Sequence, residues 1–214
     1  MIMPISFLKN KKLVIGTAQF GMNYGIANQN GQVDENEIES ILNFAYENDI
    51  NTLDTAKIYG NSEKSIGNYL KKTDKSWDVI TKVKYSDKSI FEQIQDSKEK
   101  LTVRPFVILA HTAELYLNQE FQSKLQEAKV KGLINRFGVS LYNEKEINQV
   151  LATELKPEII QLPMNILDTR LYRCGILSKL FNKGIEIHVR SALLQGLFYL
   201  SKTDLKRRFS DALP

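Results

Sequence analysis

Residues 54–63 read Asp54-Thr55-Ala56-Lys57-Ile58-Tyr59-Gly60-Asn61-Ser62-Glu63. They follow a short apolar, β-branched run, residues 50–53, that is typical of a buried strand. They precede an amphipathic run, residues 64–70, that is typical of a helix. In parallel sheets and barrels, active sites are built on such polar turns, at the carboxyl ends of the strands. Because this turn carries a carboxylate and a phenol, it is the first place where we expect chemistry.

The same alternation of strand-like and helix-like runs continues along the chain. We expect strands at residues 13–16, 52–54, 79–82, 106–110, 136–140, 159–162 and 185–191. We expect helices at residues 34–48, 64–70, 90–101, 120–132, 144–153 and 171–183, and we assign no structure after residue 200. These seven βα alternations, with no linker-like segment between them, predict one parallel α/β domain over residues 1–214.

Polar side chains at the strand ends favour a closed barrel over an open sheet. Three successive strands run into Asp54, Lys82 and His111, and a barrel would bring these side chains together at one mouth. In the last strand, Glu186, His188 and Arg190 alternate with apolar residues, so the polar face should point into the barrel and the apolar face toward the helices. We therefore predict a TIM-type (β/α)8 parallel barrel that is incomplete, with seven βα units and no eighth strand.

Composition excludes several classes of protein. The chain has 214 residues, of which 43% are hydrophobic and 25% charged, as in ordinary globular domains. The net charge of +4 is too small to indicate a nucleic acid or an anionic membrane as partner. A single cysteine, Cys174, excludes an internal disulfide, and neither a secretory signal nor a membrane-spanning run is visible. We expect a cytoplasmic protein.

The motif Asp-Thr-Ala-x-x-Tyr-Gly-x-Ser-Glu-x-x-Ile-Gly, residues 54–67, resembles the signature of the aldo-keto reductases. The resemblance recurs at five further places, so it covers nearly the whole chain: residues 16–17, 81–82, 111, 138–140 and 191–197. It implies the barrel fold and a small-molecule carbonyl substrate, namely an aldehyde, a ketone or a sugar carbonyl. The family's eighth strand, its flanking helices and the segment that usually grips the adenosine phosphate are not found in residues 1–214.

Four residues match the chemistry of carbonyl reduction. The oxygen of a carbonyl that receives a hydride gains negative charge and needs a proton donor. Tyr59 can donate, and a neighbouring ammonium, Lys82, should lower its pKa. Asp54 would pair with Lys82, and His111 would orient the carbonyl. The resemblance implies these same catalytic roles. Taken singly, each residue also has a structural interpretation: a turn cap, a half-buried aromatic, a surface lysine or a core histidine.

Hydride must come from a cofactor, because no side chain supplies it. Residues 16–21 lack the Gly-x-Gly-x-x-Gly pattern, so we do not expect a Rossmann site. By resemblance, a nicotinamide dinucleotide lies across the barrel mouth, NADP(H) in preference to NAD(H). The implied cofactor-binding residues are Gly16, Thr17, Ser140, Gln161, Arg190, Ser191, Leu193 and Gly196.

Two residues depart from the family pattern. Leu141 stands where asparagine is common, and Arg190 stands where an aromatic residue usually stacks on the nicotinamide, although a guanidinium plane can also stack. We expect no metal, because His111 and His188 lack a metal-binding spacing. One alternative is a non-catalytic member or fragment that keeps the pocket but lacks full cofactor binding. Open barrel edges would also allow self-association.

Overall fold

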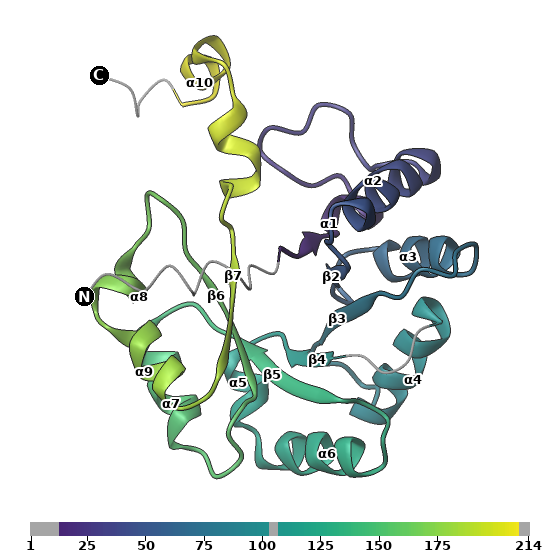
Figure 1. Cartoon of the computed structure of the whole chain (residues 1–214). Helices are drawn as coiled ribbons and strands as arrows, with labels where there is room; N and C mark the ends of the chain where they lie inside the picture. The colour runs from purple at the N-terminus through teal and green to yellow at the C-terminus, as the bar shows by residue number, and fades with distance from the viewer. Residues whose placement is uncertain (1–12, 103–106, 210–214) are drawn as a thin grey trace.

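Parallel strands and helices alternate along the chain in the computed structural model, which describes residues 13–102 and 107–209 (Figure 1). The strands are Ile15–Gly16 (β1), Thr52–Asp54 (β2), Asp78–Val83 (β3), Val107–Ala110 (β4), Arg136–Ser140 (β5), Ile159–Pro163 (β6) and Glu186–Arg190 (β7). The helices are Ala18–Gly21 (α1), Glu35–Glu47 (α2), Ser62–Leu70 (α3), Ile90–Leu101 (α4), Ala113–Leu117 (α5), Gln119–Val130 (α6), Glu144–Ala152 (α7), Arg170–Arg173 (α8), Ile176–Asn182 (α9) and Lys202–Arg208 (α10), with the 3-10 helix Leu194–Tyr199 (η2).

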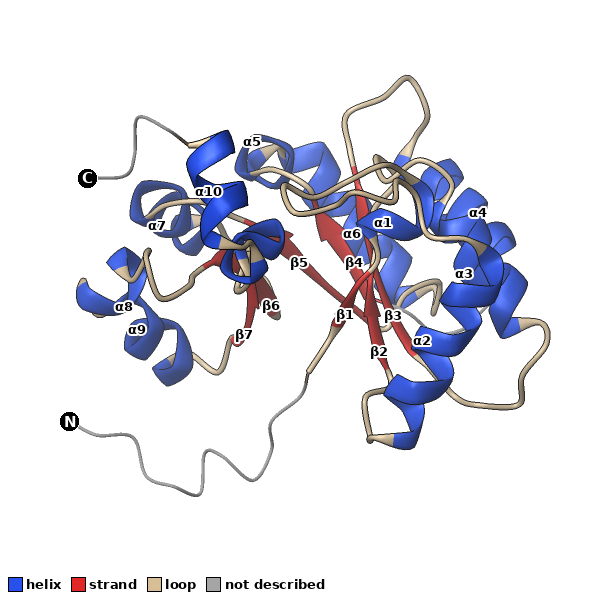
Figure 2. Ribbon diagram, turned by 90° about the horizontal axis from the view of Figure 1, so that it is seen from above, coloured by secondary structure: helices blue, strands red, loops and turns tan. Residues whose placement is uncertain are grey.

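The strands form one parallel sheet in the order β1-β2-β3-β4-β5-β6-β7. One hydrogen bond shows that the sheet is curled. Gln161 of β6 donates to Asp54 of β2 at 2.9 Å, although three strands lie between these two in the sheet. Within the described residues no strand pairs with the outer edge of β1 or β7, and Figure 2 shows the gap between them. The expected incomplete barrel with seven strands is confirmed.

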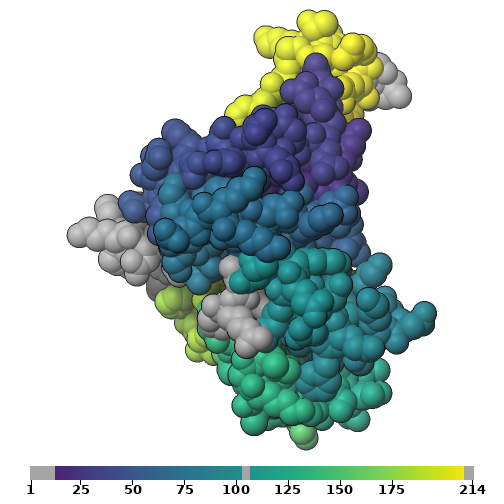
Figure 3. Space-filling view, turned by 90° about the vertical axis from the view of Figure 1, so that its right-hand side faces the viewer, coloured from purple at the N-terminus to yellow at the C-terminus, as the bar shows by residue number. Residues whose placement is uncertain are grey.

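Segments at the mouth end cross this gap. The backbone N–H of Ala27, in the loop after α1, donates to the carbonyl of Gln195 in η2 at 3.2 Å. Arg208 of α10 donates to the carbonyl of Ile26 in the same loop. The C-terminal segment accordingly lies against the N-terminal one in Figure 3, so loop contacts take the place of strand pairing there.

Alternation along the strands gives the barrel an apolar floor beneath a polar mouth. Ile80, Leu109 and Ile159 are at most 1% exposed and form a small cluster of their own. Two residues further along the same strands come Lys82, His111 and Gln161. Because successive side chains on a strand point to opposite faces, these polar residues stand directly above the apolar cluster. The larger core lies on the other face of the sheet, under the helices.

Helix ends follow local signals. Asp34 accepts a hydrogen bond from the N–H of Glu37 at the start of α2, and Ser89 and Glu92 form a capping box at the start of α4. The expected helix 171–183 is wrong as one element. It is divided into α8 and α9 because Gly175 adopts a φ of +78°, which a continuing helix cannot accommodate.

Other expectations need smaller corrections. The short helices α1, α5, η2 and α10 were not predicted from the sequence. The apolar face of β7 meets the helices only in part, because Val189 is 43% exposed. Residue 106, expected to begin the fourth strand, lies outside the described residues.

Candidate active site

Lys82 and Asp54 form a buried ion pair at the barrel mouth. Lys82 is 1% exposed, and its Nζ donates to both carboxylate oxygens of Asp54 at 2.9 and 2.7 Å and to the carbonyl of Thr55 at 2.9 Å. Gln161 donates to the same carboxylate from the opposite side. Burial lowers the pKa of Lys82, and the charge of Asp54 opposes that shift. The predicted pairing of these two residues is confirmed by this geometry.

Tyr59 stands over this pair, with its ring centroid 5.3 Å from the Lys82 ammonium. Burial, followed by the charge of Asp54, raises the pKa of Tyr59 to about 12. The expectation that Lys82 lowers this pKa is therefore wrong for the chain without ligands. Loss of solvent around the phenol outweighs the neighbouring cations, and the phenol holds its proton throughout the physiological pH range.

Close backbone packing fixes the turn that carries Tyr59. A Cβ on Gly21 of α1 would lie 1.8 Å from the carbonyl oxygen of Tyr59, so only glycine lets α1 approach this closely. A Cβ on Gly60 would lie 2.3 Å from the carbonyl of Gly21, and Gly60 also has a φ of +53°. The sequence signal for this contact was the glycine that follows Tyr59, but its partner could not be identified from one chain.

His111 follows β4 on the same side of the barrel. Burial lowers its pKa to about 4, and the charges of Lys82 and Arg190 add to the effect. The imidazole is therefore neutral near pH 7. Its Nδ1 atom is buried and has no hydrogen-bond partner in the described part of the chain. We name Asp54, Tyr59, Lys82, His111 and Gln161 the mouth cluster.

Arg190, at the end of β7, lies beside the mouth cluster. Its guanidinium carbon is 4.1 Å from the centroid of the Tyr142 ring, and its charge acts on the pKa values of Tyr59, Lys82 and His111. This confirms that the Arg190 side chain points into the barrel, as strand alternation predicted. Glu186, four residues earlier, instead pairs with Arg136 at 2.6 Å. The sequence analysis did not identify Tyr142 as a residue of the site. Because Tyr142 lies two residues after Ser140, alternation along the strand could have placed both on the same face.

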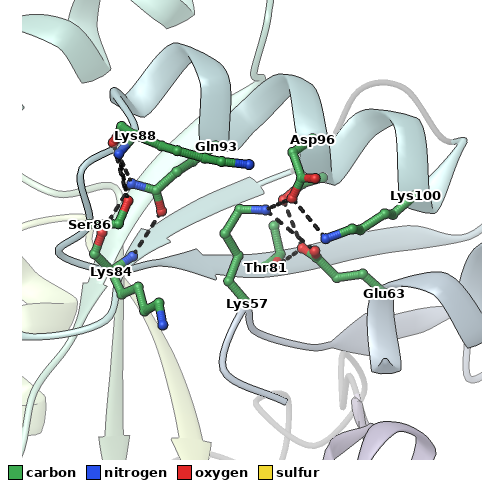
Figure 4. Close-up of polar contacts among 10 residues, drawn as sticks. Lys57, Glu63, Thr81, Lys84, Ser86, Lys88, Gln93, Asp96 and Lys100 are labelled. Carbon is green, nitrogen blue, oxygen red and sulfur yellow. Dashed lines mark hydrogen bonds and ion pairs between the residues drawn. The ribbon is translucent and has the colours of Figure 1, made fainter. Parts of the chain in front are cut away.

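A second group of charges anchors the catalytic turn to α4. Lys57 extends from the turn to Asp96 at 2.5 Å and lies 3.6 Å from Glu63, while Lys100 reaches the same Asp96 at 2.9 Å (Figure 4). Glu63 is 3% exposed and accepts hydrogen bonds from Thr81 and Ser97, two hydroxyl groups on β3 and α4. We name Lys57, Glu63, Asp96 and Lys100 the turn anchor.

The turn anchor also borders the mouth cluster through the backbone. The N–H of Lys57 donates to the carbonyl of Lys82 at 3.1 Å, so the turn is joined to β3 by its main chain and to α4 by its side chain. Thr81, which donates to Glu63, directly precedes Lys82. These contacts fix where Tyr59 stands relative to Lys82.

The expected cofactor-binding residues fall into two groups. Ser140 and Gln161 are paired neighbours on β5 and β6, both 3% exposed, and the Oε1 of Gln161 has no partner in the described chain. Thr17 is fully buried and joins β1 to β2 by donating to the carbonyl of Asp54. A Cβ on Gly16 would meet no atom within 4 Å, so there is space beside it.

The remaining candidates lie in the segment after β7, outside the mouth cluster. Ser191 has a φ of +60° and Leu193 is 53% exposed. Gly196 has a φ of +85° and packs on Ala27, which lies 2.7 Å from where its Cβ would stand. This segment spans from the end of β7 to the loop after α1, so it borders the open side of the mouth.

A hollow of about 620 Å³ lies beyond the ends of β3, β4 and β5, where residues of α5 and α7 line it. Its rim carries two exposed aromatic rings, Tyr85 and Tyr142. Thr112, which directly follows His111 in the chain, is also one of its lining residues.

This combination of a buried lysine–aspartate pair, a tyrosine and a histidine at a barrel mouth agrees with the family comparison. A profile of the aldo/keto reductase family matches residues 12–212. The chain belongs to the aldo-keto reductase family. Its members are oxidoreductases, so the general class of chemistry follows from membership.

Solved structures of aldo-keto reductases share this fold. A structure from Pseudomonas aeruginosa, described as that of an aldo-keto reductase, is 22% identical to this chain with a TM-score of 0.73. The match covers 94% of this chain and 80% of that one. An aldo/keto reductase from Brucella melitensis is 17% identical with a TM-score of 0.64, covering 92% and 74%. One from Klebsiella pneumoniae, in complex with NADP and acetate, is 16% identical with a TM-score of 0.70, covering 92% and 71%. No curated protein matches the chain.

Two features are absent from the described residues. None of their helices is both long and apolar enough to cross a membrane. They also contain no cluster of three or more His, Cys, Asp or Glu side chains that could hold a metal ion.

Proposed function

We propose that this aldo-keto reductase reduces the carbonyl group of a small molecule, with Tyr59 as the proton donor and a nicotinamide dinucleotide as the hydride source. The observation that carries the proposal is the buried Lys82–Asp54 pair directly beneath Tyr59. Burying a charged pair is costly, and a structural role alone would be met as well by apolar residues of similar volume. A cation held beside a phenol is useful where negative charge develops on a substrate oxygen.

Four residues of the mouth cluster take different parts in the proposed reaction. Tyr59, protonated because its pKa is about 12, gives its proton to the oxygen of the carbonyl. Lys82 stabilises the phenolate that Tyr59 becomes, and Asp54 keeps the lysine charged. His111 is neutral, so it can donate one hydrogen bond that orients the carbonyl without adding a further positive charge.

The orphaned acceptor of Gln161 fits the carboxamide of a nicotinamide ring. That amide carries two N–H donors, and the adjacent Ser140 hydroxyl can bond to its oxygen. When bound, the dinucleotide supplies hydride. Gly16 leaves space at the strand end, and Ser191, Leu193 and Gly196 would flank the pyrophosphate. The NADP bound to the Klebsiella pneumoniae relative supports NADP(H) over NAD(H).

The proposal is tested by titrating the purified chain with NADPH and with NADH while cofactor fluorescence is recorded. A panel of aldehydes, ketones and sugars then serves to measure carbonyl-dependent oxidation of the cofactor. We expect binding, with NADPH preferred, and turnover with at least one class of carbonyl. A chain that binds the dinucleotide but consumes none with any carbonyl would be a non-catalytic member, and a chain that binds neither cofactor would contradict the proposal altogether.

A further inference from the structure

We propose that the buried edge of the Arg190 guanidinium binds a carboxylate of the substrate, so that the enzyme selects carbonyl compounds that carry a carboxylate group. The inference rests on the proposed function and names its substrate class. It starts from an arginine at the mouth whose hydrogen-bonding capacity is unused.

Two donors of Arg190 lack partners. Its Nε and Nη2 atoms are buried, yet no described residue accepts a hydrogen bond from either. Leaving a buried donor without an acceptor costs about 1–3 kcal/mol, and more for a charged group. Such groups call for an explanation, and one explanation is a ligand that supplies the acceptors.

The Nε and Nη2 atoms form one edge of the guanidinium, and this chain shows what that edge can bind. In Arg170 the same two atoms hold the carboxylate of Asp168, with Nε at 2.8 Å from Oδ1 and Nη2 at 2.9 Å from Oδ2. This parallel pair of bonds is the strongest geometry between an arginine and a carboxylate. Arg190 presents the same edge with no carboxylate against it.

The charge balance at the mouth also favours an incoming anion. Asp54 is committed to Lys82, and no described carboxylate forms an ion pair with Arg190. The charges that act on His111 are mostly positive: Lys82, Arg190 and Lys84 lower its pKa, whereas Asp54 raises it. A carboxylate against Arg190 would oppose these positive charges.

Stacking holds the guanidinium ready for such a ligand. One face of Arg190 lies on the ring of Tyr142 at 4.1 Å, which fixes the plane and hence the direction of its edge. Tyr142 is 55% exposed and follows β5, so it is the neighbour with room to shift as a ligand enters. It also lines the 620 Å³ hollow, so one side of its ring faces open space.

An oxyanion at this edge has two possible sources, the substrate and a phosphate of the cofactor. We infer the substrate, because the charge of Arg190 acts on both Tyr59 and His111, the two groups that face the carbonyl in the proposed function. A carboxylate on the same small molecule as the carbonyl would lie within that neighbourhood.

The test compares two substrates with the same carbonyl group, 4-oxobutanoate, which carries a carboxylate, and its methyl ester, which does not. They are assayed with the wild-type chain, with Arg190→Met, which keeps bulk but no charge, and with Arg190→Lys, which keeps charge but not the planar edge. Arg170→Met is the matched control, since it removes a surface arginine whose Nε and Nη2 are already occupied by the carboxylate of Asp168. Circular dichroism and a melting curve establish that each variant is folded.

We expect Arg190→Met to lower kcat/KM for the acid by about 10- to 100-fold more than it lowers kcat/KM for the ester, the range for hydrogen bonds to a charged group. The loss of kcat/KM for the acid should be smaller in Arg190→Lys than in Arg190→Met. Arg170→Met should change kcat/KM for neither substrate. An equal loss on acid and ester overturns the inference. If NADPH affinity falls along with that equal loss, Arg190 serves a phosphate of the cofactor instead.

A second measurement does not depend on turnover. Binding of sodium propanoate, an inert carboxylate, is followed by calorimetry with wild type, Arg190→Met and Arg170→Met. Binding that is lost only in Arg190→Met supports the carboxylate edge even if no carbonyl compound is reduced, in which case the proposed function alone has failed. Absence of binding, or equal binding in all three proteins, contradicts the inference.

Discussion

Lys82 and Asp54 meet through two hydrogen bonds, at 2.9 and 2.7 Å, in a place where the lysine is 1% exposed. The two residues come from the neighbouring strands β3 and β2, and each lies at or next to the carboxyl end of its strand. Because neither charge is well solvated, each depends on the other, and the effects of changing them should not be additive.

Asp54→Asn should destabilise the fold more than Lys82→Met does. The first leaves a buried ammonium without its counter-charge, which costs about 3–5 kcal/mol, whereas the second leaves a carboxylate that is 15% exposed and bonded to Gln161. Adding Lys82→Met to Asp54→Asn should recover part of the loss. Urea unfolding of the three variants gives the coupling energy, and additive effects would show that the pair is not coupled.

Tyr59→Phe keeps the ring and removes only the hydroxyl. General acid catalysis contributes about 10²–10⁴-fold, so turnover should fall by that amount while NADPH affinity stays within about 2-fold. Tyr172→Phe, which changes an exposed tyrosine on α8, is the control. Near-native turnover in Tyr59→Phe would remove Tyr59 from the mechanism.

The pH profile of carbonyl reduction should be flat around neutrality. His111, with a pKa of about 4, is neutral from roughly pH 6 upward, so the rate should fall only as the pH drops toward 4. On the alkaline side Lys82, whose pKa is lowered, loses its proton before Tyr59, whose pKa is about 12, so the rate should fall as Lys82 becomes neutral. In Lys82→Met this alkaline decline of the residual activity should therefore be absent. A wild-type rate that declines between roughly pH 6 and 8 would contradict this assignment.

Asp96 should make stability sensitive to acid. Partial burial raises its pKa, but hydrogen bonds from Lys57 and Lys100 outweigh this and bring it to about 2. A carboxyl whose pKa is lower in the folded chain stabilises it above its ordinary pKa of 3.8, and that contribution is lost as the pH falls toward 2. Asp96→Asn should lower the melting temperature at pH 7 and weaken its acid dependence, whereas the exposed Asp87→Asn should do neither. Parallel curves for wild type and Asp96→Asn would contradict this.

Gly67→Ala should force α3 and α4 apart. A Cβ at residue 67 would lie 1.7 Å from the carbonyl oxygen of Lys100, so backbone has to move. We expect a loss of about 1–3 kcal/mol in the free energy of unfolding, the range for overpacking. Gly16→Ala is the matched control, because its Cβ would meet no atom within 4 Å. An equal effect of the two changes would show that the contact between α3 and α4 is not the cause.

The sequence predicted those features that depend on short-range pattern. The strand 136–140 and the helix 90–101 agree with β5 and α4 residue for residue, because both follow from the local pattern of apolar residues. The convergence of Asp54, Lys82 and His111 followed from their positions at strand ends.

Features that depend on distant packing could not be predicted in this way. The pKa of Tyr59 was expected to fall, but it is raised because the surrounding fold removes solvent, and one sequence does not show how deeply a turn is buried. The stack of Arg190 on Tyr142 joins residues 48 positions apart, and the division of the expected helix 171–183 depends on the conformation of Gly175.

The strand order β1 to β7 repeats the order of the chain, and this has a consequence for how the protein folds. Each new strand pairs only with the one synthesised just before it, so no pairing within the described sheet must wait for a later segment. During synthesis, at about 5–20 residues per second, the sheet can therefore grow one βα unit at a time. At every stage it presents the edge of the newest strand, and that edge is protected only when the next unit arrives.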